Sequence, residues 1–275
     1  MHTHVSLLTD YGLSDEFVGV VKCVITDAAP HVRITDITHG IPAFDVRAGS
    51  LALARAVPYV PEGIIIAVVD PGVGSGRRAI AVEVAGGRGV FLGPDNGLLP
   101  SAVNPELHLA SHGATFAGRD VFAPVAAFLA NGGDIALVGT EIDAATVMPG
   151  LVPVPTTETR EPHGEGMKCE VTWVDTFGNC QLNVGAEEVA HLGPVLRIVL
   201  DDEVRSARVC THYAAIGQGA IGAVVDSYGM VSLCIDSGSA AAELRLQAGD
   251  GVFLTAGDSV DGAAVASPVT IRRQM

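Results

Sequence analysis

Short apolar runs that end in polar or glycine-rich turns recur through the first half of this chain, and they constrain its fold more than any other feature. Five such runs occupy residues 5–10, 32–38, 63–70, 79–85 and 89–94. Several of them lack polar alternation, which is typical of strands buried on both faces. Helical spacing of apolar residues lies between them, at residues 15–28, 45–57 and 120–130, with Ser14 placed to cap the first helix. This alternation predicts an α/β domain with a central, mostly parallel sheet.

The second half of the chain has a different pattern. Residues 148–166 are dense in Pro, Thr and charge, which is typical of a linker, and we place its centre at 151–164. Short β-rich runs follow at 167–174, 196–200, 204–210, 222–225 and 230–235, and the longest helical pattern there covers only 185–191. We therefore predict an α/β domain over residues 1–150 and a small antiparallel β-barrel domain over residues 165–275.

Composition excludes several classes of partner. The formal charge of −15 is opposite in sign to what binding of a nucleic-acid backbone requires. No run reaches the roughly 18 apolar residues of a membrane span, and the N-terminal residues lack the basic and apolar regions of a signal peptide. We expect a cytoplasmic protein that acts on a cationic or neutral small molecule.

Cysteine and histidine give no sign of a metal centre or a disulfide framework. The cysteines, five in number, form no C-x-x-C pair, and we interpret them as reduced packing residues. The nine histidines do not gather at a ligand spacing, so we predict no metal site.

Polar residues end three of the predicted strands, and ligands of open α/β sheets bind beyond such ends. These ends are Asp10-Tyr11-Gly12, Asp70-Pro71-Gly72 and Pro94-Asp95-Asn96. The segment 68–78, VVDPGVGSGRR, would hold the Asp70 carboxylate at a strand tip by a tight turn, near enough for Arg77 or Arg78 to pair with it. The other arginine is expected to contact solvent or an anion. A strand pattern follows the glycines, where a nucleotide phosphate loop would need a helix.

Each of these acids also has a simpler interpretation. Asp70 could do no more than hydrogen-bond its own turn. Asp10 could bind both hydroxyls of a ribose or cap the following helix. The segment 175–179, DTFGN, could read the edge and face of a base or form an ordinary β-turn.

Six blocks in collinear order resemble the S-adenosylmethionine hydrolase family, which is related to the fluorinase and chlorinase. They cover residues 8–22, 36–49, 68–78, 93–99, 115–127 and 175–179. The resemblance spans nearly the whole chain. It implies an α/β domain followed by a small β-barrel, in a homotrimer with each active site between neighbouring subunits. It also implies that water cleaves S-adenosylmethionine into adenosine and L-methionine without a cofactor.

The resemblance assigns substrate contacts to named residues. Asp10 would hold the ribose hydroxyls, and Phe44 would pack over the substrate. Phe177 and Asn179 would meet the adenine, while Asp175 and Ser227 would contact the methionine ammonium and carboxylate; the family more often has Asn where Asp226 stands. Further substrate-binding candidates are Tyr11, Tyr213, Tyr228 and Ser237.

The same resemblance separates hydrolysis from halogenation. Asp70 and Arg77 match two members of an Asp-Arg-His set around the attacking water, whereas the halogenases have tyrosine at the position of Asp70. The family histidine is replaced by Ala117. Gly118 falls where the halogenases use a serine, and its backbone N–H could bind the water. The alternatives are a halogenase that forms 5′-halo-adenosine and a non-catalytic sensor of S-adenosylmethionine or adenosine.

Overall fold

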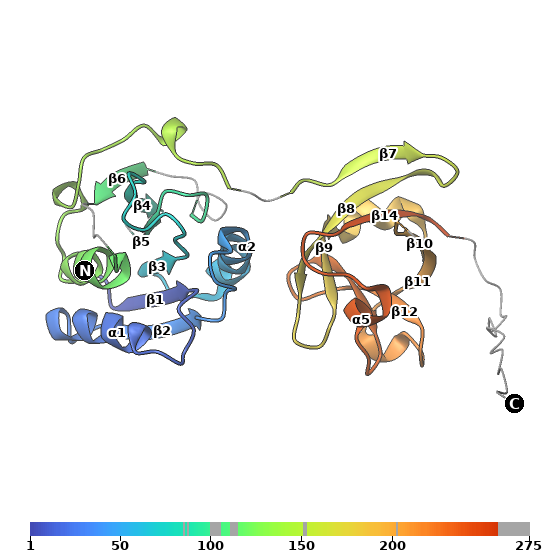
Figure 1. Cartoon of the computed structure of the whole chain (residues 1–275), viewed down its shortest axis with the longest axis horizontal. Helices are drawn as coiled ribbons and strands as arrows, with labels where there is room; N and C mark the ends of the chain where they lie inside the picture. Colours follow the sequence, from blue (N-terminus) through green and yellow to red (C-terminus); the bar gives the residue numbers. More distant parts are fainter. Residues whose placement is uncertain are drawn as a thin grey trace, which may run out of the picture. The chain divides into compact units, whose positions relative to one another are not determined.

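The computed structural model describes residues 1–84, 86, 88–99, 106–110, 115–150, 153–201 and 203–257. The chain divides into two compact units, Met1–Val152 and Pro153–Met275, which run from blue to green and from yellow to red in Figure 1. The last part of the predicted barrel domain, residues 258–275, lies outside the described residues.

The first unit is built on a six-stranded sheet in the order β2-β1-β3-β5-β4-β6. The pairs β1–β2, β1–β3 and β3–β5 are parallel, whereas β4 is antiparallel to both β5 and β6. The predicted α/β domain with a mostly parallel sheet is thus confirmed. The strands are β1 (His4–Thr9), β2 (Arg33–Thr38), β3 (Ile64–Val68), β4 (Ala79–Val84), β5 (Gly89–Pro94) and β6 (Glu106–Ala110).

Helices cover both faces of this sheet, because successive side chains of its strands point to opposite faces and both sets are apolar. In β3, Ile64 and Ile66 pack with α1 and α3, while Ile65 packs in the cluster that contains Leu53 of α2. The helical segments are α1 (Phe17–Ala28), α2 (Val46–Ala56), α3 (Ala123–Ala130), the π-helical turn η2 (Gly118–Phe122), and the 3-10 turns η1 (Val57–Tyr59), η3 (Ile135–Leu137) and η4 (Ala144–Thr146).

The second unit is a closed barrel of seven strands. The order β14-β10-β11-β12-β13-β9-β8 closes because β14 also pairs with β8, and β7 extends the sheet beyond β8 (Figure 1). The strands are β7 (Thr156–Arg160), β8 (Gly164–Val174), β9 (Cys180–Gly185), β10 (Val195–Val199), β11 (Val204–Cys210), β12 (Ile221–Val225), β13 (Met230–Ile235) and β14 (Gly251–Ala256). Short helical segments join them: α4 (Ala186–Val189), η5 (Ala190–Leu192), η6 (Tyr213–Ala215) and α5 (Ala240–Leu244).

The barrel differs from the prediction in one pairing. The strands β11 and β12 run parallel, so the barrel is mixed rather than wholly antiparallel. The connection from β11 to β12 contains the turn η6. It carries the chain back to the end of the barrel where β11 begins, whereas a tight hairpin would join two antiparallel strands.

Three local predictions were wrong. Part of the predicted linker forms the antiparallel pair β7–β8, because the Thr-rich segment 156–160 favours extended backbone. Ser14 does not cap α1: the N-cap is Glu16, without a side-chain hydrogen bond, since the helix begins too far beyond Ser14. Cys23 is exposed, although the other four cysteines are buried as expected, and all five are free thiols.

Within the described residues, no helix is both long and apolar enough to cross a membrane.

Candidate active site

A cavity of about 410 Å³ opens beyond the carboxyl ends of β1 and β3 in the first unit. The chain leaves β1 toward β2 on one side and later enters β3 on the other side, so the order of the sheet reverses at this point. Such a reversal separates the connections that follow the two strands and leaves a crevice between them. The cavity is lined by Asp10, Tyr11, Phe17, Phe44, Val68, Asp70, Val73, Thr115, Phe116, Ala117 and Arg119.

Asp70 and Arg77 form a bidentate ion pair at the cavity. Arg77 donates from Nε to Oδ1 of Asp70 at 2.7 Å and from Nη2 to Oδ2. The backbone N–H of Gly72 donates to the same Oδ1 at 3.2 Å. Only 5% of the Asp70 side chain and 14% of the Arg77 side chain are exposed. The turn therefore presents a fixed carboxylate to the cavity, with the arginine bound directly to it.

Arg78 has a different role from the predicted contact with solvent or an anion. It donates from Nε to Oδ2 of Asp95 at 2.6 Å and from Nη1 to Oγ1 of Thr146 at 3.0 Å. The other oxygen of Asp95 accepts from the backbone N–H of Met148 at 2.8 Å. The expectation for Arg78 was thus wrong, because a second aspartate at a neighbouring strand end neutralises it. This second ion pair does not line the cavity.

Asp10 holds Phe44 in place rather than capping a helix. Its Oδ2 accepts from the backbone N–H of Phe44 at 2.9 Å. Phe44 has a left-handed backbone, with φ 68°, and 69% of the residue is exposed. Strained conformations of this kind concentrate at ligand sites. The second oxygen of Asp10 has no hydrogen-bond partner among the described residues, which leaves it available to a ligand.

Tyr11 lies on another wall of the cavity, close to Gly118. The Tyr11 hydroxyl oxygen packs against the Gly118 backbone, and Gly118, which we expected to bind water, is not among the lining residues. A Cβ atom on Gly118 would lie 2.6 Å from that oxygen, which only glycine avoids. Burial raises the pKa of Tyr11, and the charges of Asp10 and Asp70 raise it further. Tyr11 therefore presents a neutral hydroxyl.

Three aromatic rings form a wall that the sequence interpretation missed in part. Tyr11 lies 5.9 Å from Phe17 and 5.6 Å from Phe116 between ring centroids, and Phe17 lies 5.2 Å from Phe116. Phe17 lies in the predicted helix 15–28, where we predicted no role at a site, but it is 41% exposed and lines the cavity. Phe116 lies in the block 115–127, and its position beside Tyr11 depends on tertiary structure. These edge-on rings offer an apolar, electron-rich surface.

A second pocket, of about 560 Å³, lies in the second unit and gathers five predicted residues. Asp175, Phe177, Asn179, Tyr213 and Ser237 line it together with Ile235 and Gly238. Asp175 is engaged by its own turn: its carboxylate accepts from the N–H groups of Phe177 and Asn179 and from the Asn179 amide. This rigid turn leaves the Phe177 ring 77% exposed at the mouth of the pocket.

Two other predicted residues do not line this pocket. Ser227 and Tyr228 lie in the turn between β12 and β13, where the Tyr228 ring is 6.4 Å from Trp173. Asp226 fixes that turn, because its carboxylate accepts from the N–H groups of Tyr228 and Met230 and from Gln181 and Ser232. The carboxylate of Asp226 is therefore satisfied within the protein.

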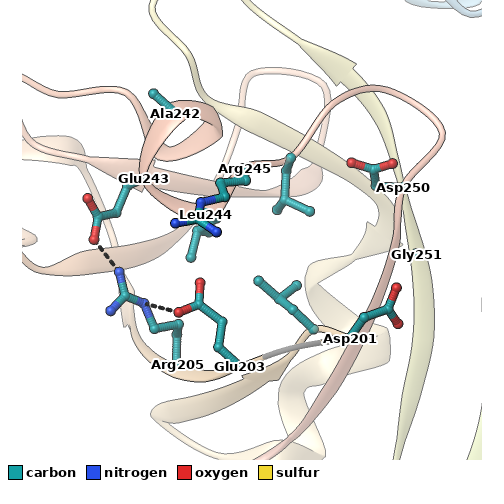
Figure 2. A pocket seen from close by; sticks show the side chains of 11 residues that line it. Asp201, Glu203, Arg205, Ala242, Glu243, Leu244, Arg245, Asp250 and Gly251 are labelled. Atoms are coloured by element: carbon teal, nitrogen blue, oxygen red, sulfur yellow. Dashed lines mark hydrogen bonds and ion pairs between the residues drawn. The ribbon is translucent and has the colours of Figure 1, made fainter.

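A third cavity, of about 650 Å³, also belongs to the second unit but contains none of the predicted residues. Figure 2 shows Arg205 between Glu203 and Glu243, with ion pairs to both. The acids Asp201 and Asp250 line the same cavity. Arg205, Glu203 and Glu243 are thus paired with one another within the protein. In the part of the chain that the structure describes, no group of three or more His, Cys, Asp or Glu residues is arranged to hold a metal ion.

Comparison with known proteins gives concordant matches for both units. Residues 5–139 match the SAM hydroxide adenosyltransferase N-terminal domain, and residues 169–253 match the corresponding C-terminal domain. The (R)-S-adenosyl-L-methionine hydrolase of Salinispora tropica is 40% identical over 92% of this chain and 98% of its own length. The fluorinase of Nocardia brasiliensis is 25% identical over 92% of this chain and 97% of its own. A crystal structure of an uncharacterized conserved protein from Thermotoga maritima superimposes with a TM-score of 0.83, at 30% identity, over 91% of this chain and 99% of the other.

Proposed function

Because this chain belongs to the SAM hydroxide adenosyltransferase family, we propose that it hydrolyses S-adenosyl-L-methionine to adenosine and L-methionine. The observation that carries the proposal is the Asp70–Arg77 pair, which lies at the wall of a cavity that also contains the free oxygen of Asp10. The relative from Salinispora tropica is named for the (R) sulfonium epimer, so we take that epimer as the substrate to test first.

The reaction is an in-line displacement at the ribose 5′ carbon. A lone pair of water forms the bond to C5′, and the C5′–S bond breaks with its electrons going to sulfur, which leaves as the neutral thioether of methionine. The water loses one proton, for which the Asp70 carboxylate at the cavity wall is the acceptor. A sulfonium is a good leaving group, so alignment and exclusion of bulk water supply more of the rate than strong deprotonation.

In this proposal, different residues of the protein contact different parts of the substrate. Asp10 accepts from the ribose hydroxyls through its unpartnered oxygen, and the aromatic wall with Phe44 surrounds the ribose and sulfonium. Phe177 and Asn179 contact the adenine, and Asp175 with Ser227 contacts the methionine end. Arg77 holds the Asp70 carboxylate in its orientation toward the water.

Purified protein should be incubated with the (R) and (S) epimers separately, and adenosine and methionine should be followed by chromatography. In water enriched with ¹⁸O, attack at C5′ places the label in the adenosine 5′ hydroxyl. Equal adenosine from the wild-type protein and an Asp70→Ala variant would overturn the hydrolase assignment. Formation of 5′-halo-adenosine in added chloride or fluoride would establish a halogenase instead, and tight binding without turnover would establish a sensor.

We further propose a homotrimer in which each active site combines the first unit of one subunit with the second unit of its neighbour. Asp70→Asn and Phe177→Ala affect different units, so one can complement the other only across a subunit boundary. The assay uses substrate well below KM, where Phe177→Ala alone should be about 10-fold less active. Co-expression at equal levels should then give about a quarter of the wild-type activity, since about one site in four combines two intact halves. No recovery in a mixed trimer, with a mass of three chains by light scattering, would refute this arrangement.

A further inference from the structure

Ala117 leaves no functional group on its part of the cavity wall. Its side chain is a buried methyl group, and 2% of the residue is exposed. The side chain at position 117 therefore cannot form a second hydrogen bond to a water molecule that Asp70 holds. Tyr11 and Asp70 line the same cavity as Ala117, and Tyr11 carries a hydroxyl.

The Tyr11 hydroxyl is fixed at both its backbone and its oxygen. The Tyr11 N–H donates to Oγ1 of Thr9 at 3.1 Å, and this oxygen is hydrogen-bonded to Nδ1 of His39 at 2.8 Å. At the other end, the phenol oxygen packs against Gly118, where an added Cβ atom would lie only 2.6 Å away. Phe17 packs against the Tyr11 ring at a tilt, and Phe116 packs against it edge-on. A hydroxyl constrained in this way can position a small ligand with little loss of entropy.

The proton of this hydroxyl has no acceptor within the described part of the protein. A phenol group has one O–H donor, and Tyr11 lines the same cavity as Asp70. Tyr11 is partly buried, and a donor in such a place favours a ligand or water that receives its proton. Tyr11 thus needs an acceptor from the contents of the cavity.

We propose that the Tyr11 hydroxyl, packed against Gly118, donates to the attacking water and serves as its second polar contact alongside Asp70. This inference rests on the proposed hydrolysis. The water accepts from Tyr11 with one lone pair and donates to the Asp70 carboxylate, which leaves its other lone pair for C5′. The proton that the water loses goes to Asp70 or bulk solvent, so Tyr11 stays neutral throughout. Gly118 contributes by orienting Tyr11 rather than by binding the water itself.

The direct test is Tyr11→Phe, which removes one oxygen and keeps the ring. We expect kcat to fall about 10- to 100-fold while KM changes less than about threefold, because the lost contact involves water rather than substrate. Tyr59→Phe is the matched control, since it removes the same oxygen from a residue that is 70% exposed in η1. That variant should retain the wild-type kcat, and adenosine binding by calorimetry should be equal in all three proteins.

A double-mutant cycle with Gly118→Ala separates positioning of water from a merely structural effect. The new Cβ would collide with the Tyr11 oxygen at 2.6 Å, whereas the remaining ring contacts, at 3.3 and 3.4 Å, are tolerable. Gly118→Ala should therefore lower kcat at least about 10-fold in the wild-type background and less than about twofold in Tyr11→Phe.

The outcomes distinguish this inference from the function on which it rests. Wild-type protein that forms adenosine, together with Tyr11→Phe at full kcat, overturns the role of Tyr11 and leaves the hydrolase intact. Additive effects of the two substitutions also overturn it. Absence of adenosine from the wild-type protein overturns the proposed function and this inference with it.

Discussion

Replacing Asp70 with asparagine tests whether the ion pair at the cavity orients the reaction or only holds a turn. Asparagine keeps the shape of the side chain but removes its charge, and one of its two terminal groups would oppose an Arg77 N–H donor. Arg77 would keep its charge with 14% of its side chain in contact with solvent. Breaking a fully buried pair costs about 3–5 kcal/mol, and the partial exposure of Arg77 brings our expectation to about 2–3 kcal/mol.

Asp95→Asn is a matched control that the chain itself provides. Asp95 is also 5% exposed and also receives an arginine, Arg78, but it lies outside the cavity. Both variants should lower the melting temperature by about 4–12 °C. Only Asp70→Asn should lower kcat, by about 100-fold or more.

Scanning calorimetry gives the stability of each variant, and chromatography of adenosine gives the rate at a temperature where all proteins are folded. Adenosine binding should remain within about threefold of wild type in both variants. Equal loss of kcat in Asp70→Asn and Asp95→Asn would refute the reasoning, because the activity would then follow stability rather than the water-facing carboxylate. A stable, fully active Asp70→Asn would refute it as well.

Three further predictions concern substrate binding, thiol chemistry and packing. Phe177→Ala should raise KM about 10-fold with little change in the melting temperature, because the residue is 77% exposed. Burial raises the pKa of Cys169, Cys180 and Cys234 to about 12, 11 and 12, so at pH 8 each of them is almost wholly the unreactive thiol. Ellman's reagent should therefore titrate about one thiol, that of the exposed Cys23, in the native protein. The buried thiols should react only after unfolding. Gly93→Ala should cost about 1–3 kcal/mol in chemical denaturation, since its Cβ would lie 2.5 Å from the Ala67 carbonyl oxygen, whereas Gly19→Ala, in an open position of α1, should stabilise by about 0.5–1 kcal/mol.

The strands of the first unit could be predicted because burial on both faces leaves an uninterrupted apolar run. The strand β9 was missed because its polar residues are also buried. Gln181 and Asn183 are 4% and 6% exposed, and each is satisfied by hydrogen bonds that no local pattern reveals. The amide of Gln181 donates to Asp226, and that of Asn183 donates to the carbonyl of Pro153 while its oxygen accepts from the Glu170 N–H. Polar residues can therefore fill a buried strand when tertiary partners are present.

The site was accessible to sequence reasoning where one short segment contains both partners, and inaccessible where two distant segments meet. Asp70 and Arg77 share a turn, so their pairing could be anticipated. The contact between Tyr11 and Gly118 depends on the π-helical turn η2 lying against the end of β1. Turns of this kind are rare and are often found at functional sites, but they have no clear sequence signal.

The separate roles of the adjacent arginines follow from strand geometry. The ladder between β4 and β5 pairs Ala79 with Pro94 and continues one step further, since the Asp95 N–H donates to the Arg78 carbonyl at 2.9 Å. Arg78 is thereby placed opposite Asp95, and its side chain reaches that carboxylate. Successive residues of an extended chain point to opposite faces, so Arg77 is directed to the other side, toward Asp70.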